Sequence, residues 1–319
     1  MSVMTTATVS AAAMTFYKKK AQSFLRKRLY INKIGTQERI DRNSGQVLST
    51  WRPVNLAAQT TPLTEGVAPS EVSITTTTYT ATLLQYGAFV KISDLLEVTG
   101  RSSMMDIAAK QLGYNAALTL DALAYAECLN FTAYYAGNKT LATIDSGDIM
   151  TLQELRRLSK RFMAKDVNPG DDDLYNFIGH PDQLYDIWQD DKVGGMLDVA
   201  RRSITNNESE GIWRGEITRV AGFRVLQSSQ ITTTTLSTDN GNLTAYQAIA
   251  AGPDCLLNVD VESMPFTLFV NPASNITIGN ELGQVGSVGW KATYVAKQIS
   301  DASAPRGYVV YSPVSELTA

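Results

Sequence analysis

Few residues in this 319-residue chain could do chemistry, and they are scattered. His180 is the single histidine, and Cys128 and Cys255 are the only cysteines. A Ser-His-Asp site needs a nucleophile on a sharp turn, and no G-x-S-x-G occurs. Zinc sites need clustered Cys and His, which are missing. We therefore expect no catalytic residue, no metal and no cofactor. We expect His180 to enter a helix ahead of Pro181, and both thiols to be buried and reduced.

Two further patterns are weaker still. The acidic run Asp171–Asp173 lacks the alternating spacing of an EF-hand loop, so a solvated turn is favoured over a cation site. The glycines at 279, 283, 286 and 289 do not follow a strand and open a helix, so a dinucleotide fold is not indicated. A hydrolase that pairs His180 with a nearby aspartate stays an alternative from another functional class.

Charge is distributed unevenly along the chain, whose formal net charge is −3. No acidic residue precedes Glu38, whereas the first 37 positions hold a cluster of basic ones: Lys18, Lys19, Lys20, Arg26, Lys27, Arg28 and Lys33. A basic arm of this kind binds nucleic acid or an acidic protein surface. The alternative is a solvated amphipathic helix, because Tyr17, Ala21, Phe24, Leu25 and Leu29 recur at helical spacing.

No segment predicts a membrane protein. No apolar run approaches the ~18 residues needed to cross a bilayer. The basic cluster follows the N-terminal small-residue stretch instead of preceding it, so we expect no signal peptide.

Residues 37–93 predict a long β-hairpin. Val72–Ser93 has strand composition, and the turn-rich stretch "TTPLTEGVAPSE" at Thr60–Glu71 precedes it. Extended throughout, Val72–Ser93 would span roughly 70 Å, whereas a lone hairpin is marginal in water. We expect burial only from Leu83 onward, and we expect the ribbon to lie across a neighbouring subunit. The alternative is a break near Thr80, with both halves packed within the monomer.

Two long helical patterns follow. The proline-free stretch from Ser103 to about Phe131 predicts a long, largely buried helix, since its second half is apolar on nearly every side. Thr151–Lys165 predicts an amphipathic helix, with Thr151 as the cap and Glu154 completing a capping box.

The remaining segments predict strands and one short helix. A strand at 174–180 and a helix at 181–191 are expected, and the polar segment 193–211 is expected to be a loop. Gly215–Ser229 predicts two strands around a turn at Ala221-Gly222, and strands are expected on either side of Gly252-Pro253. Val285–Val314 predicts a hairpin with its turn near Ser303–Gly307.

Six segments, in this order, resemble the major capsid proteins of tailed bacteriophages, specifically the family of the coliphage N-four group. The segments are "TTPLTEGVAP" (60–69), "QYGAFVKISD" (85–94), "QLGYNAALTLD" (111–121), "GHPDQLYDI" (179–187), "GEITRVAGFRVLQSS" (215–229) and "LGQVGSVGWKATYVAKQI" (282–299). The resemblance covers roughly residues 55–300.

The resemblance implies an α+β fold, the capsid fold named after coliphage Hong Kong 97. On that basis residues 1–36 form an N-terminal arm, and 37–93 form an extended loop with its tip near 60–71. Residues 94–143 and 252–319 form a peripheral domain with a spine helix at 103–131, and 144–251 form an axial domain. His180, Pro181, Asp186, Gly289, Trp290 and Lys291 lie in the matching segments as structural positions.

The implied function is that of a virion shell subunit, not an enzyme. Copies would form homo-pentamers and homo-hexamers of an icosahedral head around double-stranded DNA, assembled in the host bacterial cytoplasm. The intersubunit loop tip would comprise Pro62, Glu65, Gly66, Pro69 and Glu71, with both glutamates meeting basic groups of a neighbour. A portal, decoration and scaffolding proteins are expected partners, and contact with packaged DNA would be weak. The alternative within this fold is an encapsulin-like nanocompartment shell.

Overall fold

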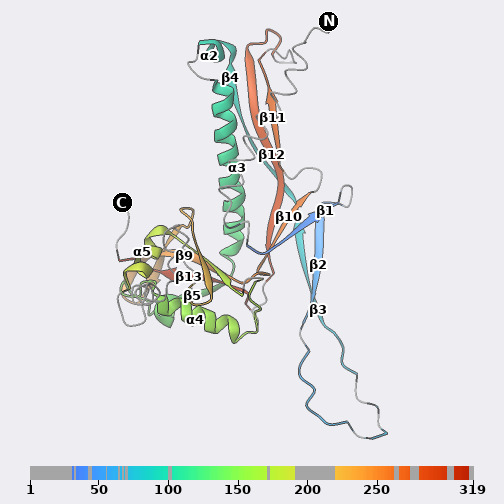
Figure 1. Cartoon of the computed structure of the whole chain (residues 1–319), viewed down its shortest axis with the longest axis vertical. Coiled ribbons are helices and arrows are strands. Elements are labelled where there is room, and N and C mark those ends of the chain that lie inside the picture. The colour runs from blue at the N-terminus through green and yellow to red at the C-terminus, as the bar shows by residue number, and fades with distance from the viewer. Residues whose placement is uncertain are drawn as a thin grey trace, which may run out of the picture.

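The computed structural model describes residues 31, 34–41, 45–54, 56–63, 65–66, 68, 71–99, 103–170, 173–190, 220–261, 266–273, 280–299 and 305–315. Figure 1 shows an upright helix flanked by long strands, a second unit of helices and strands beside its lower end, and a ribbon that runs away from both. The basic residues predicted for the arm, from Lys18 to Arg28, lie outside the described residues, as do the predicted loop 193–211 and the first strand of Gly215–Ser229.

The upright helix is α3, Met104–Cys128. Ser103 caps it by accepting a hydrogen bond from the Asp106 backbone N–H at 3.4 Å. At 1.5 Å per residue it is about 38 Å long, and its end at Cys128 falls slightly short of the predicted Phe131. One face is buried and consists mainly of small residues: Met105, Ala108, Ala109, Leu112, Gly113, Ala116, Ala117, Leu120, Asp121, Ala124, Tyr125 and Cys128. Small side chains let the helix approach the sheet closely.

The sheet against α3 is the larger part of the upright unit. In the described residues its order is β1-β10-β12-β11, with β4 also paired to β12. The strands are β1 Thr36–Ile40, β4 Leu84–Ser93, β10 Leu256–Val261, β11 Thr267–Asn271 and β12 Val285–Gln298. Their inward side chains form one core with the helix, including Ile92, Leu268, Val288, Trp290 and Tyr294. Short α2, Asp94–Thr99, leads from β4 toward α3.

The second unit is built on another sheet. Its order in the described residues is β5-β13-β9-β6-β7, with β8 also paired to β9. The strands are β5 Thr132–Tyr135, β6 Tyr175–Gly179, β7 Phe223–Gln227, β8 Thr233–Thr238, β9 Gly241–Ala251 and β13 Gly307–Ser312. Helix α4, Leu152–Met163, and helix α5, Pro181–Gln189, share one buried core with this sheet. The turn η2, Ala136–Asn138, packs on α4. Phe162, Phe177 and Phe223 are at the centre of its core.

Two predictions about these elements are wrong. Val285–Val314 is not a hairpin, because β12 pairs with β4, β10 and β11 while β13 lies between β5 and β9 in the other sheet. Thr151 precedes α4 but makes no side-chain capping bond, and no capping box forms. The Glu154 carboxylate is buried and instead accepts hydrogen bonds from the Tyr134 hydroxyl at 2.6 Å and from Arg157 at 2.5 Å.

Other predictions are confirmed. The α+β class is correct, and strands flank Gly252-Pro253. Both cysteines are free and buried, and burial raises the pKa of the Cys255 thiol to about 12. The Val72–Ser93 strand is interrupted at Leu83, giving β3 Thr76–Thr82 and β4. This is close to the break expected near Thr80 in the alternative, but the packing of both halves within the monomer is wrong, because β3 pairs only with β2 among the described strands and most of its side chains are exposed.

A buried polar network ties the upright unit to the chain entering β1. The Ile31 N–H donates to the Asp121 carboxylate of α3 at 3.1 Å, and Asn258 donates to the Ile34 carbonyl at 2.9 Å. The Tyr294 hydroxyl donates to Asn258 at 2.7 Å, and burial raises its pKa. Gly35 follows with a φ of +85°, and a Cβ there would lie 2.0 Å from the Leu256 carbonyl oxygen.

We predict that Gly35→Ala destabilises the protein more than the matched substitution Gly45→Ala. Both glycines have positive φ, so each alanine costs about 1–2 kcal/mol of backbone strain. Only Gly35 also meets a backbone oxygen that cannot move aside, whereas nothing lies within 4 Å of the Gly45 position. Urea unfolding of the purified chain, followed by circular dichroism, measures the difference; equal midpoints for the two variants would contradict it.

Candidate assembly surface

The ribbon in Figure 1 consists of β2, Val47–Pro53, and β3. They pair antiparallel from Val47 with Thr82 to Pro53 with Thr76. At the root, the Leu83 N–H donates to the Gln46 carbonyl at 2.9 Å, and the Gln46 side chain donates to the Leu83 carbonyl at 2.8 Å. Leu83 is buried with Ile40, Ala81, Leu257, Val259 and Ile299. The ribbon is therefore anchored at its root, where Leu83 packs with residues of β10.

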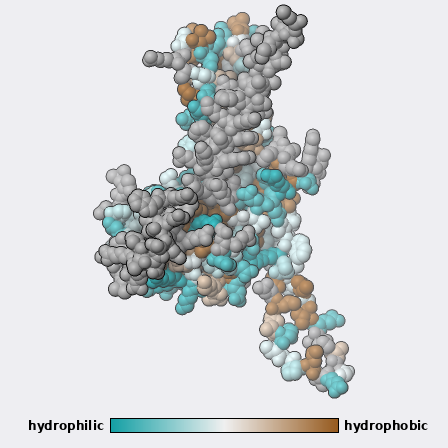
Figure 2. Space-filling model, in the orientation of Figure 1, coloured by the Kyte–Doolittle hydropathy of each residue, from teal (hydrophilic) through white to brown (hydrophobic). Residues whose placement is uncertain are grey.

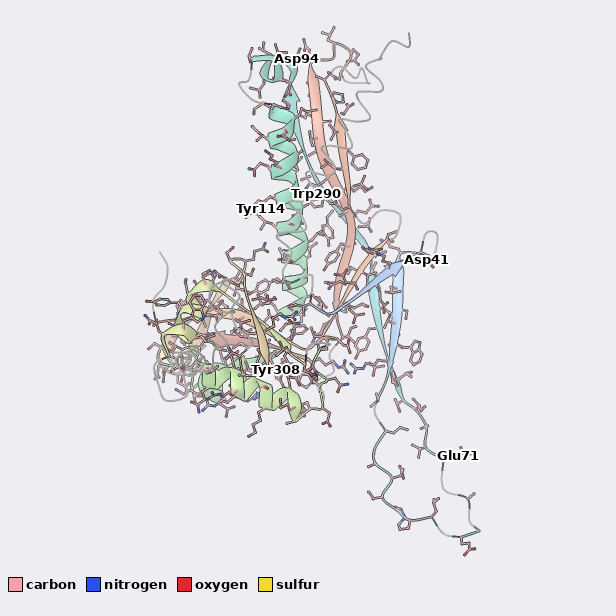
Figure 3. All side chains as sticks on the ribbon, in the orientation of Figure 1. Asp41, Glu71, Asp94, Tyr114, Trp290 and Tyr308 are labelled. Atoms are coloured by element: carbon pink, nitrogen blue, oxygen red, sulfur yellow. The ribbon has the colours of Figure 1, made fainter. Side chains whose placement is uncertain are left out.

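Beyond the ribbon, the described residues between 54 and 75 form no strand. The predicted tip residues Pro62, Glu65, Gly66 and Glu71 are all exposed there, and Pro69 lies outside the described residues. Gly66 has a φ of +80°, as expected for a turn. Figure 3 labels Glu71 on this open loop, far from the two packed units.

The ribbon and loop expose large apolar side chains. Trp51 is 66% exposed, Leu63 75% and Ile74 67%. Val47, Val54, Leu56 and Val72 are exposed as well, and Figure 2 shows hydrophobic residues along this extension. Full burial of one such side chain contributes about 1.5–3 kcal/mol. An extension that leaves this much apolar surface in water is typical of an interaction site.

A second exposed apolar surface lies on the sheet that packs on α3. In register, Phe89 of β4 pairs with Gly289 of β12, and Gly289 pairs with Phe269 of β11. Residues in register on adjacent strands project from the same face, so two phenylalanines flank a glycine. Phe89 is 68% exposed and Phe269 is 52% exposed.

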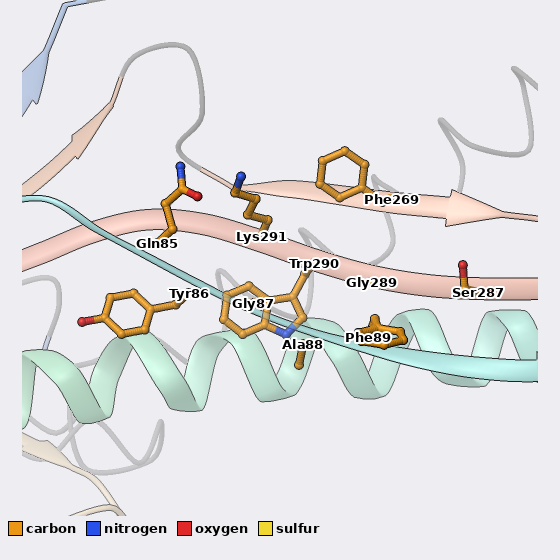
Figure 4. A pocket seen from close by; sticks show the side chains of 10 residues that line it. All are labelled: Gln85, Tyr86, Gly87, Ala88, Phe89, Phe269, Ser287, Gly289, Trp290 and Lys291. Carbon is orange, nitrogen blue, oxygen red and sulfur yellow. The ribbon is translucent and has the colours of Figure 1, made fainter. Parts of the chain in front are cut away.

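We call the resulting hollow the aromatic groove (Figure 4). It has a volume of about 420 Å³ and is lined by Gln85, Tyr86, Gly87, Ala88, Phe89, Phe269, Ser287, Gly289, Trp290 and Lys291. The floor requires glycine, because a Cβ at position 289 would lie 2.9 Å from the Cβ of Phe89. Lys291 lies two residues beyond Gly289 on β12, and Lys91 lies two residues beyond Phe89 on β4. Because these two strands are antiparallel, the two lysines lie at opposite ends of the aromatic groove.

Trp290 and Lys291 lie on opposite faces of β12. Trp290 is buried against α3, where its indole N–H donates to Asn115 at 3.0 Å. Lys291 is on the opposite, partly exposed side of β12. The prediction that everything after Leu83 is buried is therefore wrong for the outward face of β4, where Phe89 and Lys91 meet solvent. The alternation of Gly87, Phe89 and Lys91 in the sequence could have indicated this face.

The motif around His180 opens helix α5, at the helix entry expected for it. His180 caps α5. Its ring Nδ1 accepts a hydrogen bond from the Asp182 backbone N–H at 3.3 Å, and its backbone N–H donates to the Gln183 side-chain oxygen at 3.1 Å. Its ring stacks on Tyr246 at 4.4 Å, and burial lowers its pKa. Pro181 occupies the first helical position.

Asp186 belongs to the same helix and holds the segment just after β13. Its buried carboxylate accepts from both the N–H and the hydroxyl of Ser315, just after β13. His180, Pro181 and Asp186 thus lie together in the second unit, away from Gly289, Trp290 and Lys291 in the upright unit.

The described part of the chain shows no clustered group of three His, Cys, Asp or Glu that could hold a metal ion. Asp171 and Asp172 of the acidic run lie outside it. No described helix is both long and apolar enough to cross a membrane.

A sequence-family model described as "Phage capsid protein" matches residues 76–309 of the chain. The chain belongs to this phage capsid protein family. No curated protein matches the sequence. The structural matches are nevertheless extensive at low sequence identity.

The capsid of Ralstonia phage GP4 has a TM-score of 0.72 and 13% identity, covering 92% of this capsid protein and 92% of that chain. The cyanophage Pam1 capsid has a TM-score of 0.72 and 12% identity, covering 92% and 93%. A virus-like particle from Pyrococcus furiosus has a TM-score of 0.54 and 10% identity, covering 92% and 97%. These likenesses show a shared shell fold, and the family match identifies this member as a bacteriophage major capsid protein. The nanocompartment alternative is not better supported than a phage capsid protein.

We predict that the double substitution Phe89→Ala/Phe269→Ala weakens association of the capsid protein without unfolding it. Both rings are largely in water in the single chain, so the two substitutions together change its stability by about 1 kcal/mol or less. The concentration needed for assembly, measured by light scattering, should rise. Met163→Ala is the control, because Met163 is 62% exposed on α4, outside the groove. The same assembly threshold in both variants would contradict the prediction.

Proposed function

We propose that this capsid protein is the repeating subunit of the icosahedral head of a tailed double-stranded DNA bacteriophage. Copies associate as pentamers and hexamers, and the head encloses the genome. Assembly takes place in the host bacterial cytoplasm, where a portal and, in some heads, scaffolding and decoration proteins join the shell. The subunit is a structural component of the virion and not an enzyme.

In this proposal the fold is of the Hong Kong 97 type, within the coliphage N-four group. The upright unit with α3 is the peripheral domain, and the unit with α4 and α5 is the axial domain. The β2–β3 ribbon and the loop after it are the extended loop, and residues 1–36 are the N-terminal arm. The predicted loop segment 37–93 then also contains β1 and β4, which pair with β10 and β12.

The observation that carries the proposal is the exposed loop between β2 and β3. A two-stranded ribbon is only marginally stable in water. The described residues of its loop add no further strand pairing. The apolar side chains of Leu63, Val72 and Ile74 find no cover in the same chain, since each is about half exposed or more. A second copy provides that cover.

The aromatic groove is the surface of the neighbouring copy that fits the loop best. It offers two exposed phenylalanines for the apolar loop residues, and Lys91 and Lys291 for the carboxylates of Glu65 and Glu71. The described loop residues include these two acids and no base. Burial at such a contact strengthens each ion pair, because little water remains to screen it. The basic N-terminal arm of a neighbour is the other candidate partner for these glutamates.

We predict that Glu65→Lys/Glu71→Lys prevents assembly and that adding Lys91→Glu/Lys291→Glu restores it. Reversing the loop charges puts like charges opposite one another, and reversing the groove charges makes the pairs complementary again. Light scattering and electron microscopy of particles measure both outcomes. Rescue identifies the groove, loss without rescue identifies the arm, and undisturbed assembly of Glu65→Lys/Glu71→Lys would contradict a role for the loop charges.

A further inference from the structure

Helix α4 carries a concentrated positive charge in a chain whose net charge is negative. Between Thr151 and Lys165 the sequence has five basic residues, Arg156, Arg157, Lys160, Arg161 and Lys165, against the single acid Glu154. None of the contacts proposed for shell assembly uses this helix. Its exposed side is therefore not explained by the function proposed above.

The one acidic side chain of α4 does not reach the exposed side. Glu154 is 4% exposed, and its carboxylate is held by the Tyr134 hydroxyl and by Arg157. On the neighbouring segment, Asp145 and Asp148 are both paired with Lys139, at 2.9 and 2.8 Å. Asp166 follows the helix in the turn after its C-terminus. The outer arc of the helix is thus cationic along its length.

Two of the arginines are held in position before any ligand arrives. Arg161 donates to the Asn138 side chain at 2.6 Å, and its guanidinium lies 4.6 Å from the centre of the Tyr134 ring. Arg157 is fixed by Glu154 at 2.5 Å. Arg156 and Lys160 are exposed beside them. Fixed side chains lose less conformational entropy on binding than free ones.

The spacing of the cations suits a regular polyanion. Arg156 and Lys160 are four residues apart, and so are Arg157 and Arg161, which gives two adjacent rows with a repeat of about 6 Å along the helix. One strand of a DNA duplex carries a phosphate about every 3.4 Å along its axis, so the rows repeat at close to two base steps. The outer arc also carries Gln153 in place of any aromatic residue. Protein interfaces are enriched in arginine as well as in aromatic residues, so the absence of an aromatic anchor and of an exposed acid, not the arginines, is what favours a polyanion here.

We propose that the outer arc of α4, formed by Arg156, Arg157, Lys160 and Arg161, binds the phosphate backbone of double-stranded DNA without reading its sequence. This adds a nucleic-acid contact to the shell subunit and places it on the second unit, not on the basic N-terminal segment. This inference rests on the proposed function in one respect, because a phage head is what makes double-stranded DNA the polyanion. The face would meet the enclosed genome.

The test is the salt dependence of DNA binding by the full-length protein, before assembly and at a concentration below the assembly threshold. The probe is a fluorescein-labelled mixed-sequence DNA duplex, followed by fluorescence anisotropy. Each cation that neutralises a phosphate contributes about 0.9 to the slope of log K against log salt. Arg156→Ala/Lys160→Ala should therefore lower the slope by about 2, so its affinity should fall about tenfold less than that of the wild type between 50 and 200 mM salt.

The control is Arg39→Ala/Lys110→Ala, which removes the same net charge from β1 and α3, outside the proposed surface of α4. Its slope should match the wild type, and Arg156→Lys/Lys160→Arg should keep full binding. An unchanged slope in Arg156→Ala/Lys160→Ala would overturn the proposal. So would altered particle assembly with unaltered DNA binding, which would make this face a contact between copies. Because binding is measured before assembly, failure of the wild type to form particles would count against the proposed function alone.

Discussion

An unpaired loop at the end of a two-stranded ribbon is the constraint on which the rest of the structure depends. Water does not stabilise such an extension, because the paired strands are few and the loop residues between 54 and 75 bury little of their apolar surface. The fold fixes only the root, through Leu83 and Gln46. The free energy that orders the loop must then come from another molecule, so an incomplete monomer is an expected property of a subunit built for a shell.

The rigid parts of the chain position this extension. Helix α3 packs its small residues on the sheet, and β12 links β4, β10 and β11 in one surface. The same strand turns Trp290 inward to Asn115 and leaves Gly289 facing outward between Phe89 and Phe269. The core side of β12 therefore stabilises the monomer while its outer side provides a surface for association. The second unit joins through the core that Ala124, Tyr125 and Cys128 at the end of α3 share with strand residues of the second sheet, including Ile178, Ile249 and Val309.

Local signals in the sequence predicted local structure well. The proline-free stretch that begins at Ser103 predicted α3, and His180-Pro181 predicted the start of α5. The pairing of strands was harder to predict. The alternation of buried and exposed residues within β12 and β13 indicates which face is buried, but not which strand lies alongside. Glu154 fits a capping box by spacing, yet its carboxylate is bound by Arg157 on the next turn of α4 and by Tyr134, 20 residues away in the sequence, and only the first of these contacts is local. Phe89 was missed because an exposed phenylalanine looks like a core residue until its partner strands are known.

The central claim is that the loop of one copy is ordered by the sheet of the next. Electron cryo-microscopy of the purified protein, expressed alone, tests it most directly. The account predicts rings of five or six copies or closed shells, with residues 54–75 of each copy lying over β4, β11 and β12 of its neighbour. A stable monomer, or particles in which each loop folds back onto its own copy, would contradict the account.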